Sequence, residues 1–116
     1  MVHMKSMGNK PSPLKSFVLN NYRIYNFNFN IKSINNLEWE FDSIEIPQNK
    51  LNYDDMVNII ISSKYPADKM QAIINNYLLD SEDINIKKEF NDMQNYRKDI
   101  KYQVKAVLDS LKEGNI

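Results

Sequence analysis

The chain has 116 residues, 42% of them hydrophobic and 11% aromatic, and its 15 basic residues balance its 15 acidic ones. These values predict one folded domain with a single modest core, and the neutral balance gives no indication of a nucleic-acid or membrane partner. Without cysteine there can be no disulfide, thiolate nucleophile or cysteine-ligated metal, and two glycines are too few for a phosphate-binding loop. No apolar run is long enough to span a membrane. Because the absence of cysteine favours a reducing compartment, we expect a cytoplasmic protein.

The charges are distributed unevenly along the chain. Residues 1–37 carry five basic and no acidic side chains, whereas residues 38–55 carry six acids and one lysine. This pattern suggests self-association or partner steering, although solvated faces are the commoner reason for it. Gly8 and two prolines interrupt residues 1–16, so this segment is predicted to be a flexible basic arm before a single domain at residues 17–116. His3 lies in the arm with no group held near it, so we expect no catalytic role for it.

Alternation of apolar and polar residues predicts an antiparallel β-hairpin. In the first strand, residues 21–32, Phe27 and Phe29 belong to an aromatic face. The second strand follows an asparagine-rich turn and ends at Pro47. Its apolar phase changes after Asp42, which predicts a β-bulge near Asp42 and Ser43.

Three helices are predicted after the hairpin. Asn52 is a suitable N-cap for the first, and Tyr65–Pro66 ends it and begins the second. The third, residues 86–111, carries a heptad stripe that the rest of the chain or a second copy must cover, with Arg97 at one core position. The predicted fold class is α+β: an N-terminal antiparallel β-hairpin followed by two short helices and one long C-terminal amphipathic helix.

Two charged surfaces are candidate sites. The first is an acidic ladder on the second strand, whose members lie roughly 7 Å apart, too far to share one cation without further ligands. The second is a basic helix surface that could bind phosphate, although a solvated helix face is the commoner reason for such a pattern. Arg97 could also fix the helix register, pair with an acid or bind a partner. The acidic ladder comprises Glu38, Glu40 and Asp42, and the basic surface comprises Tyr96, Arg97, Lys98, Lys101, Tyr102 and Lys105.

The sequence lacks a recognisable nucleophile motif, so we expect a protein that is not an enzyme and that needs no cofactor or metal. We expect a protein–protein interaction module whose partner is another protein or a second copy of itself. We expect it to form a homo-oligomer. The stretch Tyr65 to Lys98, which includes Pro66, Ile73, Tyr77 and Phe90, resembles small proteins of phages of gut bacteria. The resemblance implies an accessory, assembly or structural component of phage or mobile-element type. The alternative is a nucleic-acid-binding accessory protein that uses the basic arm and the Arg97–Lys105 surface.

Overall fold

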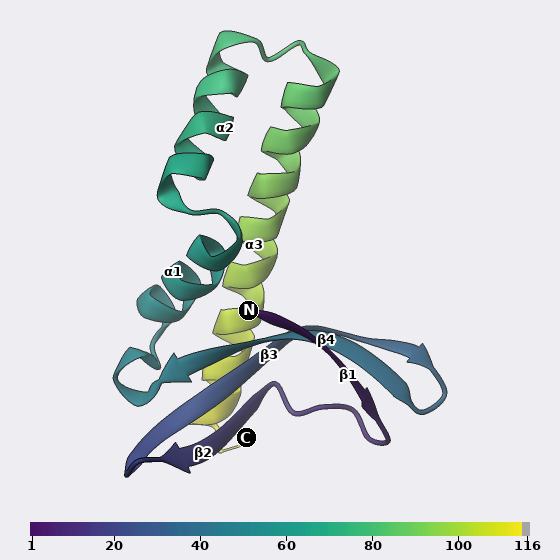
Figure 1. Ribbon diagram of the computed structural model, residues 1–116, viewed down its shortest axis with the longest axis vertical. Coiled ribbons are helices and arrows are strands. Elements are labelled where there is room, and N and C mark those ends of the chain that lie inside the picture. The colour runs from purple at the N-terminus through teal and green to yellow at the C-terminus, as the bar shows by residue number, and fades with distance from the viewer. Residues whose placement is uncertain (115–116) are drawn as a thin grey trace.

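The computed structural model describes residues 1–114, in which a four-stranded antiparallel sheet precedes three helices (Figure 1). Two helices are short and the C-terminal one is long, so the predicted α+β class is confirmed. At 1.5 Å per residue, the long helix measures about 43 Å. The elements are β1 (Val2–Met7), β2 (Leu14–Leu19), β3 (Tyr22–Asn35), β4 (Glu38–Pro47), a 3-10 turn η1 (Gln48–Lys50), α1 (Tyr53–Lys64), α2 (Ala67–Leu79) and α3 (Ile84–Lys112).

The predicted hairpin, β3 and β4, forms the centre of the sheet, whose strand order is β1-β4-β3-β2. The segment expected to be a flexible arm instead supplies β1 and the first part of β2, so that expectation is corrected. In the pairing, Lys5 lies opposite Glu40 and Leu14 lies opposite Phe27. Both are edge strands with mostly exposed side chains, which explains why their apolar pattern is weak.

Hydrogen bonds fix both ends of the connection between β1 and β2 to the central hairpin. At its start, the indole Nε1 of Trp39 donates to the Gly8 carbonyl at 3.0 Å. At its end, the backbone N–H of Asn28 donates to Pro13 O at 2.9 Å, and its side-chain amide donates to Ser12 O at 2.8 Å. The prolines and glycine in this segment therefore shape a bound crossover connection.

The β-bulge lies in β3, opposite the position predicted from the sequence. Phe29 pairs with Asp42 and Lys32 pairs with Glu40, so two residues of β3 face one residue of β4. Asn30, the first of the two, has a φ of 54°. Asparagine adopts this left-handed region more readily than most residues, which makes it a suitable bulge residue.

Because β4 itself contains no bulge, its side chains alternate without interruption. Glu40 and Asp42 therefore share a face with Ile44 and Ile46, and Ile46 is fully buried in the core. The acidic ladder is thus a polar continuation of the helix-facing side of β4, not a separate solvent face. This placement requires polar partners for the two carboxylates.

The core lies between the sheet and the helices, and it covers the heptad stripe of α3 within one chain. Met93, Ile100, Val104 and Val107 are all buried in it. The sheet and α1 lie against the C-terminal half of α3, whereas α2 lies beside its N-terminal half, away from the sheet (Figure 1). The apolar stripe therefore needs no second copy to cover it.

Polar caps begin α1 and α3. The predicted cap Asn52 accepts a hydrogen bond from Asp55 N at 3.0 Å. Asp83 caps α3 by accepting from the backbone N–H groups of Asn85 and Ile86, at 2.9 and 3.0 Å. These bonds satisfy N–H groups that have no partner within the helix.

Candidate functional site

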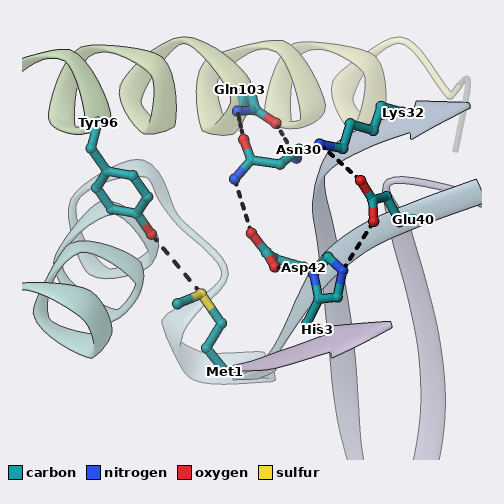
Figure 2. Close-up of polar contacts among 8 residues, drawn as sticks. All are labelled: Met1, His3, Asn30, Lys32, Glu40, Asp42, Tyr96 and Gln103. Carbon is teal, nitrogen blue, oxygen red and sulfur yellow. Dashed lines mark hydrogen bonds and ion pairs between the residues drawn. The ribbon is translucent and has the colours of Figure 1, made fainter. Parts of the chain in front are cut away.

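A network of polar side chains joins three strands to the long helix (Figure 2). β4 supplies the two carboxylates that the strand alternation turns toward the helices, and β1 and β3 supply the groups that bind them. The long helix α3 supplies Gln103, which bonds to Asn30 of β3. Only the carboxylates belong to a site expected from the sequence. We call this network the polar cluster; it comprises His3, Asn30, Lys32, Glu40, Asp42 and Gln103.

His3 bridges two acids of the neighbouring strand. It lies opposite Asp42 in the β1–β4 register, and Glu40 is two residues further along the same face. The imidazole Nδ1 is 3.0 Å from Asp42 Oδ1, and Nε2 is 3.3 Å from Glu40 Oε2. The expectation that His3 lies alone in a mobile arm is therefore wrong. Lys32 Nζ contacts the other Glu40 oxygen at 2.8 Å, so this carboxylate lies between a lysine ammonium and the imidazole of His3.

Asn30 links the strands to α3 through the bulge. Its backbone N–H donates to Gln103 Oε1 at 2.8 Å, and Gln103 Nε2 donates back to Asn30 Oδ1 at 2.9 Å. The Asn30 amide also donates to Asp42 Oδ2 at 3.0 Å. The bulge leaves the Asn30 N–H outside the strand ladder, and Gln103 supplies the acceptor that it needs.

Charge pairing shifts the pKa values in the polar cluster. Hydrogen bonding to Asp42, and then to Glu40, raises the pKa of His3 because both carboxylates favour the imidazolium. Hydrogen bonding to Lys32, and secondarily to His3, lowers the pKa of Glu40, and the same contact raises the pKa of Lys32. An imidazolium that donates from both nitrogens satisfies two carboxylates at once. This arrangement is suited to fastening β1 onto β4.

The third member of the acidic ladder lies outside the polar cluster. Glu38 instead accepts a hydrogen bond from Asn35 Nδ2 at 2.8 Å, beside the β3–β4 turn. Within residues 1–114, no group of three or more histidine, cysteine or acidic residues is arranged to hold a metal ion. Lys32, His3 and Asn30 instead supply the polar contacts of Glu40 and Asp42.

Tyr96 packs inward and does not belong to an exposed basic surface. Its ring meets Tyr65 edge to face at 5.6 Å, and Lys64 Nζ lies 4.4 Å from its centroid. Its hydroxyl contacts Met1 Sδ at 4.0 Å. Burial, and secondarily the charge of Asp42, raises the pKa of Tyr96 to about 12. Tyr96 therefore contributes to the contact between α1 and α3.

Arg97 is partly buried on α3. Its Nη1 donates to Gln94 Oε1 at 3.1 Å, one turn earlier in the helix. Its Nε is buried, and in the described part of the chain it has no hydrogen-bond partner. Among residues 1–114 no carboxylate lies within ion-pair distance of Arg97, so the structure does not bring it together with an acid of the hairpin.

The other members of the predicted basic surface lie on the outer side of α3. Lys98, Lys101 and Lys105 are exposed around Tyr102, which keeps 76% of its surface accessible. Their spacing of three and four residues places them on one helix face. Lys105 forms an exposed ion pair with Asp109 at 3.1 Å. The basic surface predicted from the sequence is thus divided. Four of its residues share this exposed face, whereas Tyr96 and Arg97 are partly buried.

Exposed aliphatic side chains gather where α2 meets α3. Leu78, Leu79 and Ile84 keep 75%, 86% and 83% of their surface accessible, although Leu78 continues the apolar stripe of α2 in the sequence. The turn between the two helices lies far from the sheet (Figure 1). In the sequence, Leu79 is an apolar residue outside the stripe of α2, and this position could have indicated an exposed apolar surface. We call this region the α2–α3 tip; it also carries Asp80, Glu82 and Asp83.

Comparison with known proteins adds no function to this description. The chain matches no protein-family model, no curated protein and no solved structure. Of the helices within residues 1–114, none combines the length and the apolar character that a membrane crossing requires.

Proposed function

We propose that this protein is a non-enzymatic protein–protein interaction module that associates with itself. We further propose that it acts in the cytoplasm as an accessory, assembly or structural component of phage or mobile-element type. The observation that carries the proposal is the exposure of three large aliphatic side chains at the α2–α3 tip: Leu78, Leu79 and Ile84.

The position of these side chains favours association over a role in folding. Tyr77 and Phe90 stack between the two helices at 4.0 Å, and Ile73 and Met93, further from the tip, are buried, so the helices already have a packed interface. Burying an aliphatic side chain contributes about 1.5–3 kcal/mol, which the tip residues can gain only from a partner. Large aliphatic side chains exposed close together in the chain are typical of interaction sites in soluble proteins. The buried heptad stripe of α3, in contrast, no longer supports an intermolecular seam.

Light scattering across a dilution series tests the proposal. We expect a mass above that of one chain at tens of micromolar, and a fall toward one chain on dilution. The double variant Leu79→Ser with Ile84→Ser should shift this equilibrium toward the monomer. Leu37→Ser is the control, because Leu37 is an exposed aliphatic residue at the β3–β4 turn, outside the tip. A wild-type monomer at tens of micromolar would contradict the proposal.

The outer face of α3 supports a second candidate function, nucleic-acid binding. Tyr102 stands exposed among Lys98, Lys101 and Lys105, which pairs a stacking surface with cations that can contact phosphate. Binding to random DNA or RNA should then weaken steeply with salt, and Lys98→Glu with Lys101→Glu should abolish it. Fluorescence anisotropy at two salt concentrations measures both effects. Binding that the double variant leaves unchanged would exclude this face.

A further inference from the structure

A second apolar surface lies at the opposite end of α3 from the α2–α3 tip. It is an open groove of about 700 Å³ between the start of α1 and the last turns of α3. Ile84 begins α3, and the groove residues of α3 lie in its last two turns, so roughly 30–40 Å of helix separates the two surfaces. We call it the basal groove; its apolar lining includes Leu51, Tyr53, Leu108 and Leu111, and its basic lining is Lys105 and Lys112.

The two surfaces are both apolar and carry opposite net charges. The tip exposes three aliphatic side chains, and the groove is lined by three leucines. The tip carries three acidic residues, of which Asp83 caps α3. The groove is lined by two lysines and by Asp109, which pairs with Lys105 at 3.1 Å, so its net charge is that of one lysine. Opposite charges around an apolar contact steer the partners and fix their relative orientation.

We propose that the α2–α3 tip of one copy of this chain docks into the basal groove of a second copy. The proposal deepens the self-association proposed above and rests on it. The aliphatic residues of the tip lie against Leu108 and Leu111, and Asp80 and Glu82 face Lys105 and Lys112. Docking of one tip against another is disfavoured, because it would bring two sets of three carboxylates together.

The two surfaces that meet are different parts of the chain, and each copy has one tip and one groove. Two antiparallel copies can exchange tip and groove, which closes a symmetric dimer with two identical contacts. When the contact is not reciprocated, it repeats from copy to copy and forms a larger ring or a filament, according to the rotation at each contact.

Complementation between two variants tests the proposal. The tip variant is Leu79→Glu with Ile84→Glu, and the groove variant is Lys105→Glu with Lys112→Glu; all four positions are exposed. Each variant alone should be a monomer at a concentration where the wild type assembles. A mixture of the two should form a dimer and nothing larger, because the tip variant keeps an intact groove and the groove variant keeps an intact tip.

Charge reversal supplies an independent test. The groove variant should weaken self-association by about tenfold or more, because like charges then meet across the contact. Adding Asp80→Lys and Glu82→Lys to the groove variant should restore assembly. The matched control is Lys10→Glu with Lys15→Glu, which makes the same change in net charge at exposed sites outside both surfaces and should leave assembly unchanged.

The outcomes separate this inference from the proposed function. A wild-type chain that stays monomeric contradicts both. A wild-type assembly that survives the tip and groove variants contradicts only the docking of tip into groove. A mixture of the two variants that stays monomeric, although each loses assembly alone, also contradicts the docking of tip into groove.

Discussion

His3 and Asp42 face each other across β1 and β4, with the imidazole Nδ1 3.0 Å from the carboxylate. The same ring reaches Glu40, so one side chain of the N-terminal strand binds two acids of its neighbour. Because most side chains of β1 are exposed, apolar burial contributes little to holding this strand. The polar contacts of His3 therefore add to the backbone pairing that attaches β1 to β4.

We predict that the attachment of β1 weakens as pH rises. The pKa of His3 is raised above its ordinary value of 6.5 by Asp42 and Glu40. The stabilisation is therefore fully present below pH 6.5 and is lost as pH rises through the higher folded-state pKa. Hydrogen exchange of the β1 amides, corrected for intrinsic rates, should show protection that falls over this interval. The His3 ring signals in an NMR titration should report the raised pKa directly.

The variant His3→Gln provides the control for this pH dependence. Glutamine can still donate a hydrogen bond but does not titrate, so β1 protection should be lower at acidic pH and independent of pH from there upward. The amides of β3 should not respond in either protein. If the wild type and His3→Gln gave the same pH profile in β1, the imidazole would not be holding the strand.

A second prediction concerns the link between Asn30 and Gln103. Two hydrogen bonds join these residues, at 2.8 and 2.9 Å, and they connect the β-bulge to α3. Gln103→Leu should lower the free energy of unfolding by about 1–2 kcal/mol, because it removes both bonds and leaves the bulge N–H without this acceptor. Chemical denaturation followed by circular dichroism measures the change.

A double-mutant cycle shows whether the loss comes from this pair. Asn30→Gly keeps the left-handed backbone accessible but removes the side chain. In the double variant with Gln103→Leu, the loss of unfolding free energy should be smaller than the sum of the two single losses, since both changes remove the same side-chain bond. Strictly additive losses would show that the two residues stabilise the fold separately.

A third prediction concerns the start of the long helix. Asp83 accepts two backbone hydrogen bonds at the N-terminus of α3. Asp83→Ala should therefore cost about 0.5–2 kcal/mol, whereas Asp83→Ser, which keeps an acceptor, should cost less. Denaturant titration compares the two. An alanine variant as stable as the wild type would show that water replaces the cap.

The main elements could be predicted from the sequence because their patterns are local. Phe27 and Phe29 alternate with polar residues in one strand, and they are buried and stacked at 5.4 Å. Asn52 immediately precedes α1 and caps it. The two outer strands could not be predicted in the same way, because β1 is stabilised by pairing with β4, which lies about 40 residues later. Edge pairing of this kind leaves little apolar signal in the strand itself.

The candidate sites were harder to predict, because they depend on which residues meet in space. The change of apolar phase near Asp42 indicated a bulge, but the sequence alone did not show that the extra residue belongs to the facing strand, at Asn30. That difference decides where the acidic side chains point. It brings Glu40 and Asp42 onto the helix-facing side, where His3 and Gln103 complete the polar cluster. Periodicity within one strand carries no information on such partners.

The final prediction tests where the heptad stripe of α3 is buried. Ile100 is fully buried within one chain, so Ile100→Ala should lower the free energy of unfolding by about 2–5 kcal/mol. The exposed variant Tyr102→Ala, two residues away, should change it by less than about 0.5 kcal/mol. Denaturation at two protein concentrations should give the same difference, because the stripe is covered by the sheet, α1 and α2. A loss that grows on dilution would mean that a second copy covers Ile100.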